Sequence, residues 1–231
     1  MHARNTIRDY CSLMLILLPP SEGKNEGSHE QVLSLAKLSF SKFLTDARVR
    51  ALTESKLKAA KALTAPAIDI YSGVLYQALD YRSLSPRAMK RADREVVIIS
   101  ALFGALRPQD HIPSYKMKIK NSLWKASVSQ ALESLDADLV IDCRSSTYAG
   151  VWTPEASKTV AVRVFQEKKG KRSVITHMSK KYRGEFTRIL LQSKKIKTPK
   201  QVKEIASRHF KAELHASKGK EPWYLDLIIK G

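Results

Sequence analysis

The stretch Val96–Lys120, VVIISALFGALRPQDHIPSYKMKIK, decides how the rest of the chain is interpreted. It opens with four β-branched residues, a composition typical of a buried strand. Gly104 then stands where the backbone needs a positive φ or a close approach to another group. Arg107 precedes a proline, so a helix cannot run through it. The stretch therefore predicts a buried strand, a sharp turn and a loop.

The end of this stretch alternates between apolar and basic residues. The segment Tyr115–Lys120, YKMKIK, predicts a half-buried strand with its two aliphatic side chains on one face. The other face carries Lys116, Lys118 and Lys120, about 7 Å apart, which repel each other unless an anion or solvent screens them. A solvated edge strand protected by lysines shows the same pattern. Arg107 nearby favours an anion-binding surface.

The charge of the chain points to polyanionic partners. With 41 Lys and Arg against 22 Asp and Glu, the 231 residues carry a net charge of +19. Residues 158–231 hold 20 of these cations and 6 of the acids, a net of +14. Such an excess indicates nucleic acid first and an anionic membrane second, although a basic surface also serves solubility.

The cysteines, the histidines and the apolar runs of the chain argue against a disulfide-rich protein, a metalloprotein and a membrane-spanning protein. Cys11 and Cys143 cannot build a disulfide scaffold, and neither has a metal-binding spacing. The six histidines are scattered, so we expect no metal and no cofactor. The longest apolar run, Leu13–Leu18, is too short to span a bilayer. We expect a cytoplasmic protein in which residues 1–13 are a loosely packed upstream extension and residues 14–231 form one domain.

Apolar periodicity predicts strands and helices along the whole chain. The predicted strands are at residues 14–18, 96–99, 138–142, 159–165, 172–176 and 223–229. Helices are predicted from Pro86 to Arg94, Ser122 to Leu135, Ser179 onward and Pro199 to Phe210. No internal repeat or interdomain linker interrupts this pattern.

Two loops that follow predicted strands carry polar side chains. Pro19–Gly27 contains Lys24 but lacks the Walker pattern, which excludes a Walker-type nucleotide-binding loop. The second loop, residues 143–150, contains Arg144, Ser146 and Tyr148. Open α/β sheets bind ligands at the carboxyl ends of their strands, so both loops are candidate ligand contacts. An ordinary helix cap with a packed tyrosine accounts for the second loop equally well.

Two predicted helices are basic. Residues 86–94 place Arg87, Lys90, Arg91 and Arg94 on one helix face. This helix and the following Phe103-Gly104-Ala105 loosely match a helix-hairpin-helix DNA element. Ser179 is predicted to cap the later helix, whose first turns hold Lys180, Lys181 and Arg183. Cations at a helix N-terminus oppose the macrodipole, which favours an anionic ligand there.

Six segments, in order, resemble the YaaA family of bacterial peroxide stress proteins. They are MLILLPPSEGK, YSGVLYQAL, LFGALRPQDHIPSYKMKI, CRSSTYAGVW, SKKYRGEFTRILL and PWYLDLII, which together reach from Met14 nearly to the C-terminus. The resemblance implies a single-domain α/β fold with a mixed sheet surrounded by helices, a helix-hairpin-helix-like element and a basic cleft. It also implies binding to distorted DNA, and protection against hydrogen peroxide that limits free iron and DNA damage.

The first hypothesis is a monomeric, non-enzymatic DNA-binding stress protein. Its basic side chains would bind phosphates without reading sequence, and Tyr71, Tyr115 or Tyr148 would stack on unpaired bases. The DNA-contact candidates, partly carried over from the resemblance, are Lys24, Arg107, Tyr115, Lys116, Lys118, Arg144, Lys180, Lys181 and Arg183.

The alternative is an enzyme acting on a nucleotide or nucleic acid in the same cleft. Asp110, Ser146, Tyr148 and Lys181 would then supply the acid and base groups, provided that the loops converge. No motif names a nucleophile. A third reading, association with anionic membranes, lacks a basic amphipathic helix with aromatic anchors, so we expect no membrane partner.

Overall fold

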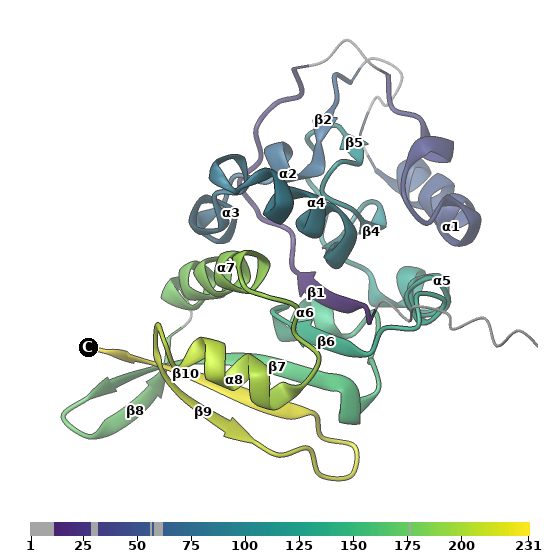
Figure 1. The fold of residues 1–231 in the computed structure, drawn as a ribbon. Coiled ribbons are helices and arrows are strands. Elements are labelled where there is room, and N and C mark those ends of the chain that lie inside the picture. Colours follow the sequence, from purple (N-terminus) through teal and green to yellow (C-terminus); the bar gives the residue numbers. More distant parts are fainter. Residues whose placement is uncertain (1–11, 29–31, 56, 58–61, 176) are drawn as a thin grey trace, which may run out of the picture.

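The computed structural model describes residues 12–28, 32–55, 57, 62–175 and 177–231. One eight-stranded sheet has the order β4-β3-β1-β6-β7-β10-β9, with β8 paired to β7 (Figure 1). A second, two-stranded sheet pairs β2 with β5. The strands are β1 Met14–Leu18, β2 Ala65–Pro66, β3 Val96–Ser100, β4 Gly104–Leu106, β5 His111–Ile112, β6 Leu139–Asp142, β7 Thr159–Lys168, β8 Lys171–Val174, β9 Lys211–His215 and β10 Trp223–Lys230.

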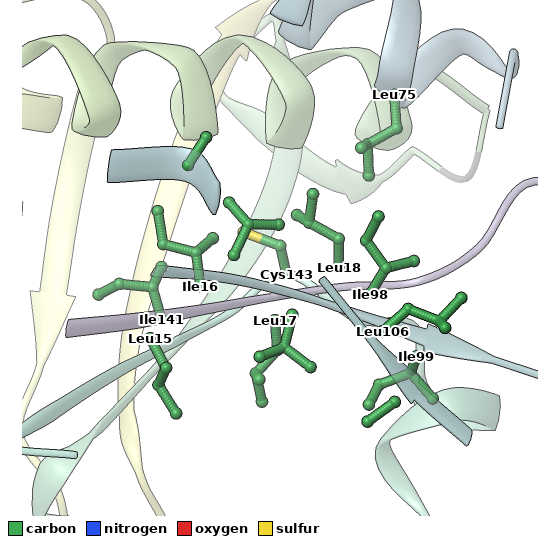
Figure 2. Close-up of a cluster of buried hydrophobic side chains, with 14 of the residues drawn as sticks. Leu15, Ile16, Leu17, Leu18, Leu75, Ile98, Ile99, Leu106, Ile141 and Cys143 are labelled. Atoms are coloured by element: carbon green, nitrogen blue, oxygen red, sulfur yellow. The ribbon is translucent and has the colours of Figure 1, made fainter. Parts of the chain in front are cut away.

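The main sheet is mixed. Strands β3, β1, β6, β7 and β10 run parallel to their neighbours, whereas β4, β8 and β9 are antiparallel additions. Strand β1 lies in the middle and is buried throughout its length, which explains its uninterrupted apolar sequence. Figure 2 shows Ile16 and Leu18 on one side of β1 and Leu15 and Leu17 on the other. Both faces of the sheet are therefore covered, and the mixed α/β fold class is confirmed.

Two groups of helices cover the sheet. Helices α1 and α5 pack together and against β4, whereas α7 packs against α3, α4, α8 and β7. Figure 1 shows these two groups on different sides of β1. The helices are α1 Ser41–Glu54, α2 Ala67–Ile70, α3 Val74–Leu79, α4 Pro86–Glu95, α5 Asn121–Glu133, α6 Ser146–Ala149, α7 His177–Gln192 and α8 Pro199–Ala206. No helix in the described ranges is long and apolar enough to cross a membrane.

The central stretch forms a hairpin and not the expected helix-hairpin-helix element. Helix α4 begins as predicted, with Ser85 accepting a hydrogen bond from the Ala88 amide and proline in the first turn. The β-branched residues after it form β3, and a turn returns the chain as β4. Gly104 has φ of +75°, and a Cβ there would lie 2.6 Å from the Trp124 ring. The strand preference of residues 96–99 and this turn prevent a second helix.

The lysine-rich segment after this hairpin is not a strand. Residues 113–120 pair with no strand, although their exposure alternates as predicted, with Lys116, Lys118 and Lys120 exposed. The antiparallel strand β4 already occupies the sheet edge next to β3. The alternation of apolar and basic residues therefore predicted which side chains are buried. It did not show that the segment pairs with a neighbouring strand.

The predicted boundaries at two other places also need correction. Residues 1–11 of the expected extension lie outside the described residues, but Leu13 is anchored by backbone and side-chain hydrogen bonds to Asp138. Helix α7 begins at His177, so Ser179 lies within its first turn and is not its N-cap.

A lysine and hydroxyl cluster at the carboxyl ends of the strands

Three parallel strands end beside one another, and polar side chains gather at their carboxyl ends. The loop after β1 contains Ser21 and Lys24, β3 ends at Ser100, and the loop after β6 contains Tyr148. Strand β1 has β3 on one side and β6 on the other. Ligands of open α/β sheets bind at this edge, so the cluster is the candidate site.

Buried hydroxyl groups form the floor of the cluster. The Tyr115 hydroxyl lies 2.9 Å from the Tyr71 hydroxyl and 2.8 Å from the Ser100 hydroxyl. The Tyr76 hydroxyl donates to the Pro19 carbonyl oxygen, and its ring stacks on Tyr71. Burial raises the pKa of Tyr71, Tyr76 and Tyr115, so these phenols are neutral near pH 7.

The burial of these rings corrects the expected stacking role. Tyr71 is 1% exposed and Tyr115 is 6% exposed, so neither ring can stack on a DNA base in this conformation. Tyr148 is half-buried and is the remaining candidate of the three. Burial raises its pKa, and the nearby Glu22 carboxylate raises it further. The charge of Glu22 on the loop after β1 therefore acts on Tyr148 on the loop after β6.

Lys24 lies directly above this floor. Its Nζ donates to the Ser21 carbonyl oxygen at 2.8 Å and sits 4.5 Å from the centre of the Tyr115 ring. The backbone of Lys24 bridges to Tyr71, which holds the loop against α2 and α3. Burial lowers the pKa of the Lys24 ammonium, and the charge of Glu22 partly opposes this shift. The structure thus brings together Lys24, Tyr115 and Tyr148 of the predicted residues.

Arg144 organises the loop after β6 and is not free to bind a ligand. Its guanidinium forms hydrogen bonds with both carboxylate oxygens of Asp142, at 2.9 and 2.7 Å. It also donates to the carbonyl oxygens of Tyr148 and Trp152, and the residue is 5% exposed. Ser145 is the N-cap of α6 but makes no capping hydrogen bond with its side chain, so the expected helix cap is not formed. Ser146 begins α6 and is exposed.

Arg107 and Asp110 lie away from the cluster. Asp110 accepts hydrogen bonds from the Arg107 amide and from the amide and hydroxyl of Ser39. The Arg107 guanidinium donates to the Val96 carbonyl oxygen, at the amino end of β3. Burial lowers its pKa to about 10, against the opposing effect of the Asp110 charge.

The distance from Asp110 to the loop after β6 follows from the strand order. Asp110 binds the residue after β4, and Tyr148 follows β6, three strands away. Neighbouring strands are about 4.8 Å apart, so β4 and β6 lie roughly 14 Å apart across the sheet. The enzyme alternative requires Asp110 to lie near Ser146 and Tyr148. The structure does not bring these residues together.

The three basic residues of α7 have different surroundings. Lys180 is exposed, whereas Lys181 pairs with Glu185 one turn later at 3.5 Å. Arg183 points inward and donates to the Val162 carbonyl oxygen of β7 at 3.1 Å. Its charge also acts on the buried Cys143 thiol. Lys180 is therefore the best placed of the three to meet a partner, together with the exposed Lys116 and Lys118.

Helix α4 carries a basic face that was noticed in the sequence but not included among the DNA contacts. Pro86, Arg87, Lys90, Arg91 and Arg94 line a shallow groove of about 600 Å³. Arg91 and Arg94 both pair with Glu95 at 2.8 Å. Arg91 also donates to three carbonyl oxygens at the end of α7, those of Leu190, Leu191 and Ser193. Arg87 and Lys90 remain exposed on the groove.

Sequence reasoning also missed Ser21, Tyr76 and Ser100. None of the three was among the candidate site residues of the sequence analysis. A hydroxyl group at the end of a parallel strand was the available signal for Ser100. Tyr76 had no such signal, because its hydroxyl reaches Pro19 only in the folded chain.

One group of residues has the spacing of a metal site. Within the described part of the chain, Glu213, His215 and Asp226 place ligand atoms within 4.8 Å of one another. Arg163 binds both oxygens of Asp226, and Arg172 binds both oxygens of Glu213. Because arginines already neutralise these carboxylates, the group is better explained as a set of ion pairs between strands.

The fold and the cluster define a class of protein: a mixed α/β domain with its candidate site at the carboxyl ends of parallel strands. The chain belongs to the peroxide stress protein YaaA family, whose model matches residues 14–215. This confirms the resemblance found in the sequence and links the chain to the response to peroxide stress.

Similar proteins occur in several bacteria. A UPF0246 protein of Streptomyces coelicolor is 34% identical over 260 positions, covering 94% of this chain and 98% of that protein. A UPF0246 protein of Corynebacterium glutamicum strain R is 36% identical, covering 84% of this chain and 91% of the other. A UPF0246 protein of Ruegeria pomeroyi is 28% identical, covering 71% and 70%. These relatives match over most of their own length.

Proposed function

We propose that this protein binds DNA through the phosphate backbone during the response to hydrogen peroxide, and thereby limits oxidative DNA damage and free iron. Membership of the peroxide stress family supports the biological setting. The observation that carries the DNA-binding proposal is the groove on α4, which is lined by three arginines and one lysine. A net charge of +19 supports binding to a polyanion.

The spacing on α4 suits a row of phosphates. Arg87, Lys90 and Arg94 follow one another at intervals of three and four residues, so they share one helix face. A helix rises 1.5 Å per residue, which places the ends of this row about 10 Å apart. Glu95 is the carboxylate that pairs with this face, and it is shared by Arg91 and Arg94. Uncompensated positive charge is therefore left for phosphates.

The proposed DNA contacts differ from those expected from the sequence. Arg107, Arg144 and Arg183 are bound to groups within the protein, so we do not assign phosphates to them. Lys116, Lys118 and Lys180 are exposed and remain proposed contacts. A preference for distorted DNA remains part of the proposal, with Tyr148 as the ring left to stack on an unpaired base.

The test is binding of labelled duplex, bubble and single-stranded DNA, measured by fluorescence anisotropy from 50 to 200 mM salt. The variant Arg87→Ala/Lys90→Ala removes two proposed phosphate contacts. We expect weaker binding and a salt slope, log K against log salt, that is shallower by about 2. The matched control, Lys42→Ala/Lys125→Ala, removes two exposed cations from α1 and α5. An equal loss in both variants, or a flat salt dependence, would overturn the proposal.

A further inference from the structure

We propose that the carboxyl ends of β1 and β6 form a second binding site, for a phosphate monoester carried on a sugar or nucleoside, with Lys24 as the receiving cation. This site lies at the edge of the sheet and is separate from the basic groove on α4. The proposal does not rest on DNA binding, because different residues carry it.

The strand order of the sheet reverses direction between β1 and β6. From β1 the chain continues to β3 on one side, and from β6 it continues to β7 on the other side. The loops that leave neighbouring strands β1 and β6 therefore diverge. Such a reversal of strand order is where open α/β sheets bind their ligands, beyond the carboxyl ends of the strands. Lys24 comes from the first of these loops and Tyr148 from the second.

The ammonium group of Lys24 is partly shielded from water, and it forms no ion pair with a carboxylate in the described part of the chain. Its ammonium group contacts the Ser21 carbonyl oxygen and the face of the Tyr115 ring, which are both neutral. Across the described ranges, no carboxylate lies within ion-pair distance of it. Arg144 differs, since its guanidinium meets the Asp142 carboxylate at 2.7 Å. A partly dehydrated ammonium is stabilised when an anion completes its shell.

The groups around Lys24 favour a phosphate that carries hydroxyl groups. Ser146 and Thr147 are exposed on the same loop as Tyr148, and their hydroxyls can donate to the oxygens of a phosphate bound at this loop. Glu22 is exposed and close enough to raise the pKa of Tyr148. A carboxylate here repels any phosphate, but it can accept hydrogen bonds from sugar hydroxyls, which inorganic phosphate lacks, as in other α/β nucleotide sites. We therefore infer a sugar phosphate or nucleotide and not free phosphate.

Isothermal titration calorimetry with AMP, ribose 5-phosphate, inorganic phosphate and adenosine tests the proposal. We expect AMP and ribose 5-phosphate to bind at least tenfold more tightly than adenosine or inorganic phosphate. Lys24→Met should weaken AMP binding at least tenfold, and the matched control Lys125→Met, at an exposed lysine on α5, should leave it unchanged. Equal binding of AMP and adenosine, or equal effects of the two variants, would overturn the proposal.

Lys24→Met could weaken AMP binding simply by loosening the loop after β1. A second pair of variants, at Ser146, therefore tests the site without changing that loop. Ser146 is exposed at the first position of α6, where Asp or Asn is compatible with the helix start. Ser146→Asp places a negative charge beside the phosphate and should weaken AMP binding several-fold, whereas Ser146→Asn should bind AMP as the unmodified protein does. If Ser146→Asp and Ser146→Asn bind AMP alike, the phosphate does not lie here.

Two further comparisons identify the source of the phosphate and separate the two proposals. Tighter binding of a 5′-phosphorylated oligonucleotide than of its 5′-hydroxyl form would assign the site to strand ends. Equal binding of the two oligonucleotides, with AMP still bound, would assign it to free nucleotides. Arg87→Ala/Lys90→Ala should lose duplex DNA affinity and keep AMP affinity. Failure of either proposal can thus be recognised independently of the other.

Discussion

Single residues in this protein often have roles that their chemical type does not reveal. Arg144 lies in a polar loop, and its guanidinium stabilises that loop by a hydrogen bond to the Asp142 carboxylate. Asp110, a carboxylate in a predicted catalytic set, secures Ser39 and the turn after β4. Cys143 directly follows β6 and is fully buried, and its thiol is hydrogen-bonded to Thr187 of α7.

Asp110→Asn should destabilise the fold by about 2–3 kcal/mol, because the carboxylate accepts three hydrogen bonds and an amide cannot accept all of them. Urea denaturation measures the change, with Asp46→Asn on the exposed side of α1 as control. DNA affinity should stay the same. A loss of DNA affinity in folded Asp110→Asn would contradict this purely structural role.

The Cys143 thiol should make stability sensitive to alkaline pH. Burial raises its pKa from 9.0 to about 12, while Arg183 opposes and Asp142 reinforces the shift. Since the folded-state pKa is the higher one, the stabilisation is complete below pH 9 and is lost as pH rises towards 12. Between pH 8 and 10 the free energy of unfolding should fall by about 1.4 kcal/mol on this account.

Urea denaturation at pH 8, 9 and 10 checks this expectation, and Cys143→Ala is the comparison. The buried tyrosines also have pKa values raised above 10.0, so each adds about 0.4 kcal/mol to the fall by pH 10. The fall between pH 8 and 10 should therefore be smaller by about 1.4 kcal/mol in the Cys143→Ala variant. The same fall in both proteins would show that the thiol is not responsible.

At the scale of elements, α7 joins the two halves of the chain. It packs against α3 and α4 from the first half and against β7 and α8 from the second. Arg91 of α4 binds the last carbonyl groups of α7, which otherwise lack partners at a helix end. Gly184 lets α3 approach α7 closely, because a Cβ at this position would lie 2.1 Å from the Leu75 carbonyl oxygen.

Gly184→Ala should therefore destabilise the protein by about 1–3 kcal/mol, even though alanine favours a helix more than glycine does. The added methyl group meets backbone, so relief requires α3 and α7 to separate. Thermal denaturation measures the effect, and Lys180→Ala, which is exposed on the same helix, should change stability little. A more stable Gly184→Ala protein would mean that the two helices can shift without cost.

At the scale of the whole molecule, one sheet and one core extend from β1 to β10. The hydrophobic core includes Leu17 of the first strand, Trp124 of α5 and Leu227 of the last strand. The two halves of the chain share this core, and α7 crosses between them. The positive charge, in contrast, is uneven, because residues 158–231 carry most of the excess.

We therefore expect a single unfolding transition. Far-ultraviolet circular dichroism and tryptophan fluorescence should report the same urea midpoint, because Trp124, Trp152 and Trp223 belong to one cooperative unit. Leu17→Ala should lower both midpoints together, through a loss of about 2–5 kcal/mol. Two separate transitions would contradict the single domain.

Much of the fold could be predicted because it depends on local patterns. The continuous apolar run at residues 14–18 indicated a strand, which the structure buries along its whole length, and Ser85-Pro86 indicated the start of α4. The strands at residues 139–142 and 223–230 follow from similar runs. Period two failed at Tyr115–Lys120, because alternating burial does not require a neighbouring strand. β9 was also missed, since KAELH contains few apolar residues.

The sequence by itself determined the fold class, the family and the positive charge, because these follow from composition, periodicity and ordered motifs. Only the tertiary structure decided which polar residues meet. It placed Lys24 over Tyr115 and beside the loop of Tyr148, although these residues are far apart in the chain. It moved Arg107 and Asp110 to the other side of β3. The physical reason is that strand order and direction, which depend on long-range packing, set the neighbours of every loop.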